Sequence, residues 1–154
     1  MYINLICEKY IMEVIQWKYP EPYSCYNYPD YVTLKKQNWG IVNELINKEQ
    51  FRFICKDSDL IGFFRMQPDK KYILISLGIR PDLCGHGYGK SIVSFIIRNI
   101  FQESNLPIRL NVRTFNLRAI KCYEKVGFKI ISKFTQSIFG ENIEFFQMEI
   151  KKQE

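Results

Sequence analysis

Three glycines at alternate positions constrain this chain more than any other feature of its sequence. Gly85, Gly87 and Gly89 follow an apolar stretch, Ile73 to Ile79, and precede isoleucines and valines at helical spacing. A strand that turns directly into a helix needs a tight backbone path, and glycine adopts positive φ angles without steric cost. Amides in such a turn, with the helix N-terminus behind them, attract anions. The sequence therefore predicts a phosphate-binding turn.

Three kinds of nucleotide-binding loop place glycines between a strand and a helix. A Rossmann fingerprint requires glycine at position 90, where this chain has Lys90. A P-loop requires a glycine five residues before Gly89, and Cys84 stands there. Neither pattern fits. A glycine-rich structural turn that binds no ligand is a further alternative.

The third kind is the pyrophosphate loop of the GNAT acetyltransferase superfamily, with the pattern Arg/Gln-x-x-Gly-x-Gly/Ala. The segment from Cys84 to Gly89 resembles it, except that Cys84 replaces the usual Arg or Gln. Because backbone amides do most of the anion binding, we expect this difference to weaken cofactor affinity without removing it. A second segment is similar to the family's other signature, Asn-x-x-Ala-x-x-x-Tyr-x-x-x-Gly-Phe. The matching residues are Asn116, Ala119, Tyr123, Gly127 and Phe128.

Hydrophobic periodicity predicts strands and helices around both motifs. Strands are expected near residues 51–56, 60–66, 72–79, 108–112, 129–139 and 143–151, and helices near 8–17, 38–47, 89–100 and 117–126. The resemblance implies an α/β (α+β) acyl-CoA N-acyltransferase fold, with a mixed central sheet of about six to seven strands and about four flanking helices. The sheet would be splayed near its fourth and fifth strands. With 154 residues and no linker or repeat, we expect a single domain over residues 1–154.

The resemblance also implies which residues bind the cofactor. Backbone groups of Leu77, Gly78 and Ile79 would bind the pantetheine arm, and Asn116 would contact the cofactor. Asn116 is also a good helix N-cap, and the two roles are compatible. The expected pyrophosphate-binding residues are Cys84, Gly85, His86, Gly87, Tyr88, Gly89 and Lys90.

Tyr123 matches the family's general acid, which protonates the departing CoA thiolate. A phenol with an ordinary pKa near ~10 is protonated at neutral pH and suits this role. The alternative is a core tyrosine on an apolar helix face. The general base stays open: the family often has a glutamate on its fourth strand, and residues 73–77 hold no carboxylate. Deprotonation would go through water and backbone groups, or through a distant Glu21 or Glu144.

Two further side chains resemble catalytic groups. His86 lies inside the pyrophosphate loop, so we expect it to face solvent or contact phosphate rather than act as a base. Cys122 is next to Tyr123, but no histidine partner is evident for a covalent acyl-enzyme. Direct attack in a ternary complex is the simpler mechanism.

A tyrosine-dense stretch from Trp17 to Tyr31 contains three prolines and predicts an extended, irregular path. The resemblance places the acceptor side near this part of the chain. Aromatic walls with hydroxyl tips suit a cationic amine, so we expect Tyr23 and Tyr26 to bind the acceptor. Alternatively, these rings only cover one end of the core.

Composition excludes several other function classes. The net charge of +6 comes from scattered cations rather than a basic stripe, which disfavours nucleic-acid binding. Apolar runs are too short for a membrane span, and the N-terminus lacks a secretory hydrophobic stretch, so we expect a cytoplasmic protein. Five widely spaced cysteines, among them Cys7, predict reduced thiols, and their spacing to the single histidine predicts no metal.

These observations predict an enzyme that transfers an acetyl group from acetyl-CoA to a primary amine. The acceptor would be a small molecule or peptide, and the protein a monomer or homodimer. A catalytically silent acyl-CoA-binding or sensing module is the alternative. Tyr123 favours the enzyme, whereas Cys84 and the missing strand carboxylate leave room for the module.

Overall fold

The structure is a computed structural model that describes residues 1–5 and 8–154, so the expectation for Cys7 lies outside the described residues. Seven strands form one mixed sheet in the order β1-β2-β3-β4-β5-β7-β6. The elements, in chain order, are β1 (Tyr2–Asn4), α1 (Glu8–Gln16), η1 (Ser24–Tyr26), α2 (Tyr31–Lys36), η2 (Gly40–Val42), α3 (Glu44–Gln50), β2 (Phe51–Lys56), β3 (Asp59–Pro68), β4 (Ile73–Ile79), η3 (Pro81–Leu83), α4 (Tyr88–Glu103), β5 (Ile108–Arg113), α5 (Leu117–Val126), β6 (Lys129–Ile138) and β7 (Glu141–Ile150).

The chain divides into two compact units. The first unit comprises Met1–Arg65 and Leu77–Cys84, and the second comprises Met66–Ser76 and Gly85–Glu154. Strands β3 and β4 each contribute residues to both units. The glycine-rich segment also contains a boundary, because Cys84 belongs to the first unit and Gly85 to the second.

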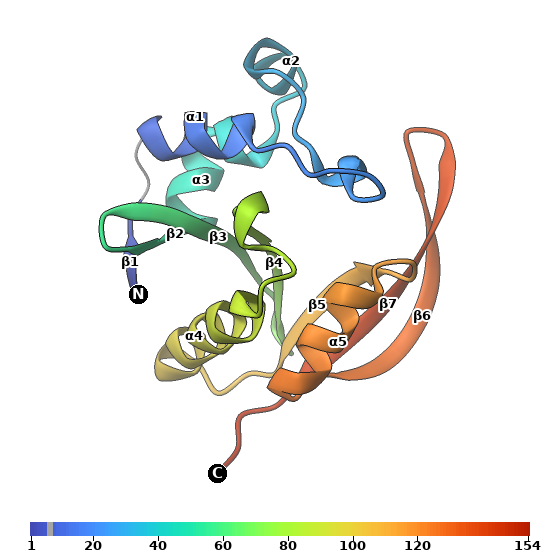
Figure 1. Ribbon diagram of the computed structural model, residues 1–154. Helices are drawn as coiled ribbons and strands as arrows, with labels where there is room; N and C mark the ends of the chain where they lie inside the picture. The colour runs from blue at the N-terminus through green and yellow to red at the C-terminus, as the bar shows by residue number, and fades with distance from the viewer. Residues whose placement is uncertain (6–7) are drawn as a thin grey trace. The chain divides into compact units, whose positions relative to one another are not determined.

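The first unit is built on the antiparallel β1-β2-β3 part of the sheet (Figure 1). Asp57 and Ser58 make the β2–β3 turn with positive φ angles. Helix α1 buries its apolar residues, as helical spacing predicts, in a core rich in aromatic rings. The core residues are Ile11, Val14, Ile15, Trp17, Leu34, Ile41, Val42, Phe51, Phe53, Cys55, Leu60 and Phe63.

The second unit combines a parallel and an antiparallel strand pair. β4 pairs with β5 in parallel from Ile73 to Ile75, and β5 pairs with β7 along its whole length. The β4–β5 register ends after these three pairs, which is the splay expected for these strands. Helices α4 and α5 contact each other, and Figure 1 shows them next to one another. α4 buries an isoleucine-rich face: Ile92, Val93, Ile96, Ile97 and Ile100.

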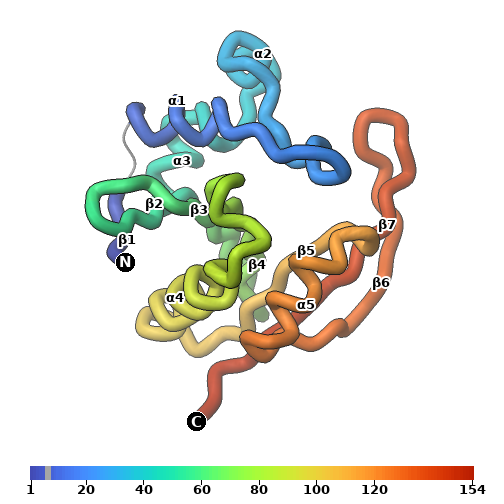
Figure 2. Tube along the Cα trace, viewed as in Figure 1, coloured from blue at the N-terminus to red at the C-terminus, as the bar shows by residue number. Residues whose placement is uncertain are grey.

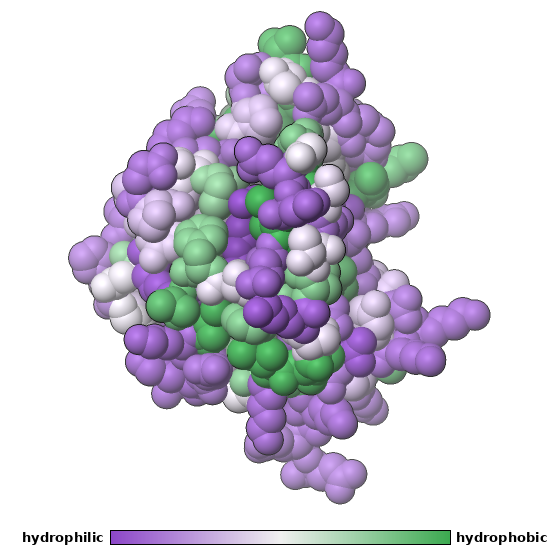
Figure 3. Space-filling model, turned by 90° about the vertical axis from the view of Figure 1, so that its right-hand side faces the viewer, coloured by the Kyte–Doolittle hydropathy of each residue, from purple (hydrophilic) through white to green (hydrophobic). Residues whose placement is uncertain are grey.

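The β6–β7 hairpin turns at Gly140, which has a φ of 79°. β6 is an end strand of the sheet, and most of its side chains are exposed. Ile130 and Ile131 are among the exposed hydrophobic residues, as is Phe139 in the turn. On the face shown in Figure 3, hydrophobic residues are interspersed with hydrophilic ones.

The expected fold class is confirmed, and one local expectation needs correction. The helix expected over 38–47 is instead the 3-10 turn η2 followed by α3, because the Asn43 side chain caps α3 by accepting from the amides of Leu45 and Ile46. Strand β1 and helix α2 were not predicted. Among the described residues, no helix is long and apolar enough to span a membrane.

Candidate functional site

The glycine-rich segment forms the turn that the sequence predicts. After η3, Cys84 is extended, and then Gly85 and Gly87 have φ angles of 76° and 85°. Gly87 is the N-cap of α4, so the chain enters the helix through a left-handed residue. Figure 2 shows the trace turning between β4 and α4. A Cβ atom at Gly87 would meet no atom within 4 Å. Glycine is therefore required here by backbone conformation rather than by crowding, and the space beside it is open.

The N-terminus of α4 has the properties of an anion site. Gly87 offers no side-chain cap, and the first turn of α4 carries no acidic residue. His86, Tyr88 and Lys90 are exposed. The first amides of a helix have no partner within the helix, and its dipole adds positive potential there. This turn therefore has the features of an anion-binding turn.

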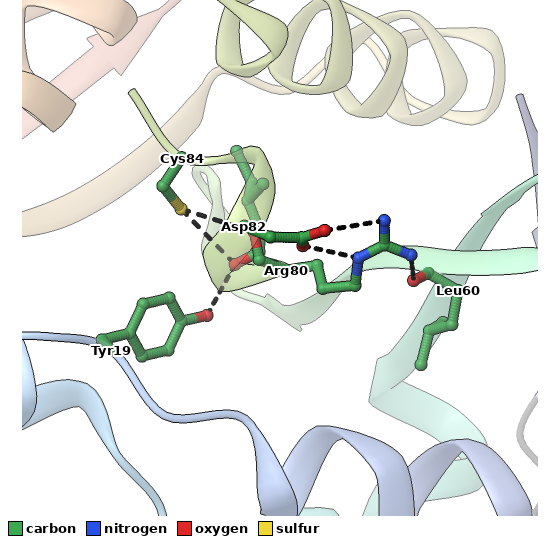
Figure 4. A network of polar contacts seen from close by, with 6 residues as sticks. Tyr19, Leu60, Arg80, Asp82 and Cys84 are labelled. Atoms are coloured by element: carbon green, nitrogen blue, oxygen red, sulfur yellow. Dashed lines mark hydrogen bonds and ion pairs between the residues drawn. The ribbon is translucent and has the colours of Figure 1, made fainter. Parts of the chain in front are cut away.

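Cys84 faces the chain that precedes it. Its Sγ lies 3.6 Å from the carbonyl oxygens of both Ile79 and Arg80 (Figure 4). The Arg80 guanidinium pairs with Asp82 at 2.7 Å and donates to the Leu60 carbonyl at 3.2 Å. Hydrogen bonding to Asp82 raises the pKa of Arg80. These contacts, all in the first unit, fix the turn between β4 and the glycines.

The end of β4 lies against an aromatic ring. A Cβ atom at Gly78 would stand 2.3 Å from Cε1 of Phe63, so only glycine fits beside this ring. Phe63 is buried and contacts the rings of Trp17 and Tyr28. The carbonyl of Ile79 accepts a hydrogen bond from the Tyr19 hydroxyl at 2.7 Å.

Helix α5 has the ends that the second motif predicts. The Asn116 side chain is buried and accepts from the Ala119 amide at 3.2 Å, which confirms its capping role. Its contact with a cofactor stays a prediction. At the other end Gly127 has a φ of 120°, and the amides of Gly127 and Phe128 donate to the Tyr123 carbonyl. The Tyr123 ring is half-buried and meets Phe128 edge-on, with centroids 5.9 Å apart.

The structure brings the glycine turn and the second motif together within the second unit. Nη1 of Arg118 lies 3.7 Å from where a Cβ of Gly85 would be. A guanidinium beside the turn adds a fixed positive charge where Cys84 supplies none. Arg118 is one of the scattered cations near the motifs, and it is not among the site residues that the two motifs predict. Its position next to Ala119 in the second motif was the available signal.

Four other side chains are candidates for catalysis: Glu21, Glu144 and His86 as bases, and Cys122 as a nucleophile. Glu21 accepts a short hydrogen bond from Ser24, and Glu144 binds Thr114 and Lys133. His86 is exposed, in line with a solvent-facing role. Burial raises the pKa of the Cys122 thiol, which disfavours a nucleophilic thiolate. The four described cysteines are free thiols: Cys25, Cys55, Cys84 and Cys122.

The tyrosine-dense stretch combines buried and accessible rings. Tyr28 contacts Trp39 and Phe63, and its burial raises its pKa to about 12. Tyr23 is half-buried, and Tyr26 is 36% exposed at the end of η1. Part of the stretch therefore covers the core, while Tyr26 is accessible for binding.

The chain matches a family model and several solved structures. The model describes the acetyltransferase (GNAT) family and matches residues 9–128. A chimeric spermidine N-acetyltransferase SpeG from Vibrio cholerae and hSSAT superposes with a TM-score of 0.76 at 18% identity, covering 97% of this chain and 94% of the other. The ribosomal-protein-S18-alanine N-acetyltransferase from Escherichia coli gives a TM-score of 0.67 at 15% identity, covering 97% and 92%.

A third solved structure holds a ligand. The aminoglycoside acetyltransferase AAC(6')-Ib, in complex with coenzyme A, gives a TM-score of 0.70 at 17% identity and covers 94% of this chain and 92% of the other. Comparison with curated proteins gave no match. At these identities the structures establish a shared fold, and the family match spans most of the chain, including both motifs. The chain therefore belongs to the GNAT family of acetyltransferases.

Proposed function

We propose that this protein is an N-acetyltransferase that moves an acetyl group from acetyl-CoA to a primary amine. The observation that carries this proposal is the left-handed turn at Gly85 and Gly87, which opens the uncapped N-terminus of α4 beside Arg118. Amides, helix dipole and guanidinium at one place favour a diphosphate. Family membership makes CoA the diphosphate ligand with the best support.

We propose a separate task for each surrounding element. Residues 84–90 hold the pyrophosphate, and Asn116 contacts the cofactor from the start of α5. The end of β4 binds the pantetheine arm through backbone groups, which Gly78 makes possible by keeping the strand close to Phe63. Tyr123 donates a proton to the CoA thiolate as the carbon–sulfur bond breaks.

The acceptor must lose a proton before it attacks the thioester. An alkylammonium is mostly protonated at neutral pH, and the nitrogen lone pair is needed for attack. β4 carries no carboxylate, and Glu21 and Glu144 are already hydrogen-bonded. We therefore propose that this proton leaves through water, and that the amine nitrogen attacks the acetyl carbonyl directly. The tetrahedral adduct then expels the thiolate.

The accessible tyrosines of the first unit are the proposed acceptor side. Tyr23 precedes η1 and Tyr26 ends it, and both have aromatic rings that suit a cation. The solved structures with this fold act, by their names, on spermidine, on a ribosomal-protein alanine and on aminoglycosides. These three amine classes define the first acceptors to test.

The test is incubation of the purified protein with acetyl-CoA and one acceptor from each class. We expect steady CoA release with at least one amine, together with an acetylated product in mass spectrometry. Release without any amine measures thioester hydrolysis and serves as the blank. The alternative, a silent acyl-CoA-binding module, rests on Cys84 at the Arg or Gln position. Tight CoA binding without turnover across a broad amine panel would select that alternative.

A further inference from the structure

Tyr19 connects the tyrosine-dense stretch to the end of β4. Its hydroxyl donates to the Ile79 carbonyl at 2.7 Å, although the two residues are 60 positions apart in the chain. The Cys84 thiol lies 3.6 Å from the same carbonyl. Figure 4 shows both side chains directed at this oxygen. This carbonyl thus accepts from the Tyr19 phenol, and it shares the single Cys84 thiol hydrogen with the Arg80 carbonyl, which also lies 3.6 Å from the sulfur.

The direction of this carbonyl follows from the strand pairing. The Arg80 amide donates to the Ile61 carbonyl on β3 at 2.9 Å, so Arg80 directs its N–H toward β3. Backbone groups of alternate strand residues point to the same edge, and neighbouring residues point to opposite edges. Leu77 and Ile79 therefore direct their backbone groups away from β3. Tyr19 therefore binds on the edge of β4 that faces away from β3, and we place the pantetheine arm on this same edge.

Tyr19 is itself held in place. Its amide donates to the Asn27 side chain at 2.6 Å, a hydrogen bond between two residues of the tyrosine-dense stretch. The neighbouring Trp17 packs on Phe63 with ring centroids 6.1 Å apart, and Phe63 is the ring that lies beside Gly78. The same aromatic cluster therefore supports both the donor, Tyr19, and the strand that carries the acceptor.

We propose that Tyr19 is a positioning residue for the pantetheine arm of the acyl donor. Its hydroxyl fixes the Ile79 carbonyl and sets the path of the last residues of β4, so that the arm meets a preorganised strand edge. With two protein donors on this carbonyl, the arm would bind other backbone groups of the strand end. This inference rests on the proposed function, because it presumes that a CoA ester binds here.

The test compares two ligands by calorimetry on the full chain. CoA contains the pantetheine arm, whereas 3′-phospho-ADP is the half of CoA that ends at the pyrophosphate. We expect Tyr19→Phe to weaken CoA binding by about 3- to 10-fold, the scale of one neutral hydrogen bond, and 3′-phospho-ADP binding by less than about 2-fold. Tyr31→Phe, which removes a phenol from α2 in the same unit, is the matched control and should change neither affinity.

A second variant tests the shared carbonyl. Cys84→Ala removes the weaker donor and should cost about 2-fold in CoA affinity. Combined with Tyr19→Phe it should cost more than the product of the two, because the carbonyl then loses both donors. Equal losses for both ligands in Tyr19→Phe, or unchanged CoA affinity, would overturn the inference. A wild-type protein that binds neither ligand would instead contradict the proposed function.

Discussion

The two compact units differ most in charge. The first unit has nine Lys and Arg residues against nine Asp and Glu, whereas the second has thirteen against seven. The entire net charge of +6 therefore belongs to the second unit. Tryptophan and tyrosine show the opposite bias, since both tryptophans and seven of the ten tyrosines lie in the first unit.

This difference supports a proposed division of tasks, in which the glycine turn binds the acyl donor and Tyr23 and Tyr26 bind the acceptor. The cationic unit carries the glycine turn, α4 and α5, and its potential attracts an anionic ligand such as a CoA ester. The neutral unit carries the tyrosines proposed for the acceptor, and its lack of net charge would not repel a cationic amine. Changes at the glycine turn and in α5 should therefore alter CoA binding and chemistry, and changes at Tyr23 and Tyr26 should alter acceptor binding.

The largest effect is expected from Tyr123→Phe. The variant keeps the edge contact with Phe128 but removes the proton proposed for the thiolate. We expect kcat to fall by about 10²- to 10⁴-fold, with little change in Tm or CoA affinity. Single-turnover rates check this without interference from product release. Tyr72→Phe, another phenol of the second unit, is the control, and a Tyr123→Phe enzyme as fast as wild type would remove Tyr123 from the mechanism.

Gly87→Asp tests the anion site. A carboxylate at the α4 N-terminus would repel the pyrophosphate, and the φ of 85° disfavours a side chain. We expect CoA affinity to fall by at least about 100-fold in calorimetry. Gly87→Asn separates the two causes, because asparagine has the same size, tolerates left-handed conformations and carries no charge. Equal affinities for the Asp and Asn variants would mean that charge plays no part here.

Gly78→Ala tests whether close packing between β4 and Phe63 stabilises the first unit. The new methyl group would collide with the buried ring of Phe63, so we expect a loss of about 1–3 kcal/mol in the free energy of unfolding. Urea denaturation measures this loss. Ser76→Ala, at an exposed position of the same strand, should be neutral. Combining Gly78→Ala with Phe63→Leu should recover part of the stability; without recovery, the clash with Phe63 is not the cause.

The smallest effect is expected from the acceptor side. Replacing Tyr23 and Tyr26 by alanine should raise the acceptor KM by about 3- to 10-fold through the lost ring contacts, while acetyl-CoA binding stays intact. Steady-state kinetics with an acceptor found in the amine screen give both constants. A loss of acetyl-CoA affinity would break the proposed division of tasks, and unchanged kinetics would confine these rings to packing.

Sequence patterns predicted the elements whose boundaries are local. β2 begins and ends at the expected residues, and α5 begins after Asn116 and ends before Gly127, because capping groups act within one turn. α2 was missed although Asp30 caps it by accepting from the Thr33 amide, a signal present in the sequence. β1 has only three residues and exists because it pairs with β2, which no local pattern reveals.

The candidate site shows the same limit. The glycine turn could be predicted because its conformation is a property of its own residues. The contact between Tyr19 and Ile79 could not, because it joins segments 60 residues apart. Arg118 lies beside Gly85 only because α4 and α5 pack together. The sequence thus predicts the conformation of the glycine turn. It does not predict that Tyr19 and Arg118 lie beside the turn region, because tertiary packing places them there.

The two ends of the sheet expose backbone hydrogen-bonding groups to very different degrees. β1 leaves an edge of three residues, whereas β6 leaves an edge of ten. A long edge can template pairing with another chain, which leads to aggregation. β6 carries Lys129 and Lys133 and has a register shift between Ile130 and Ser132. Charge and irregularity of this kind discourage edge-to-edge growth. The colloidal stability of the protein therefore depends on this strand, and neutralising its two lysines would make pairing at this edge easier.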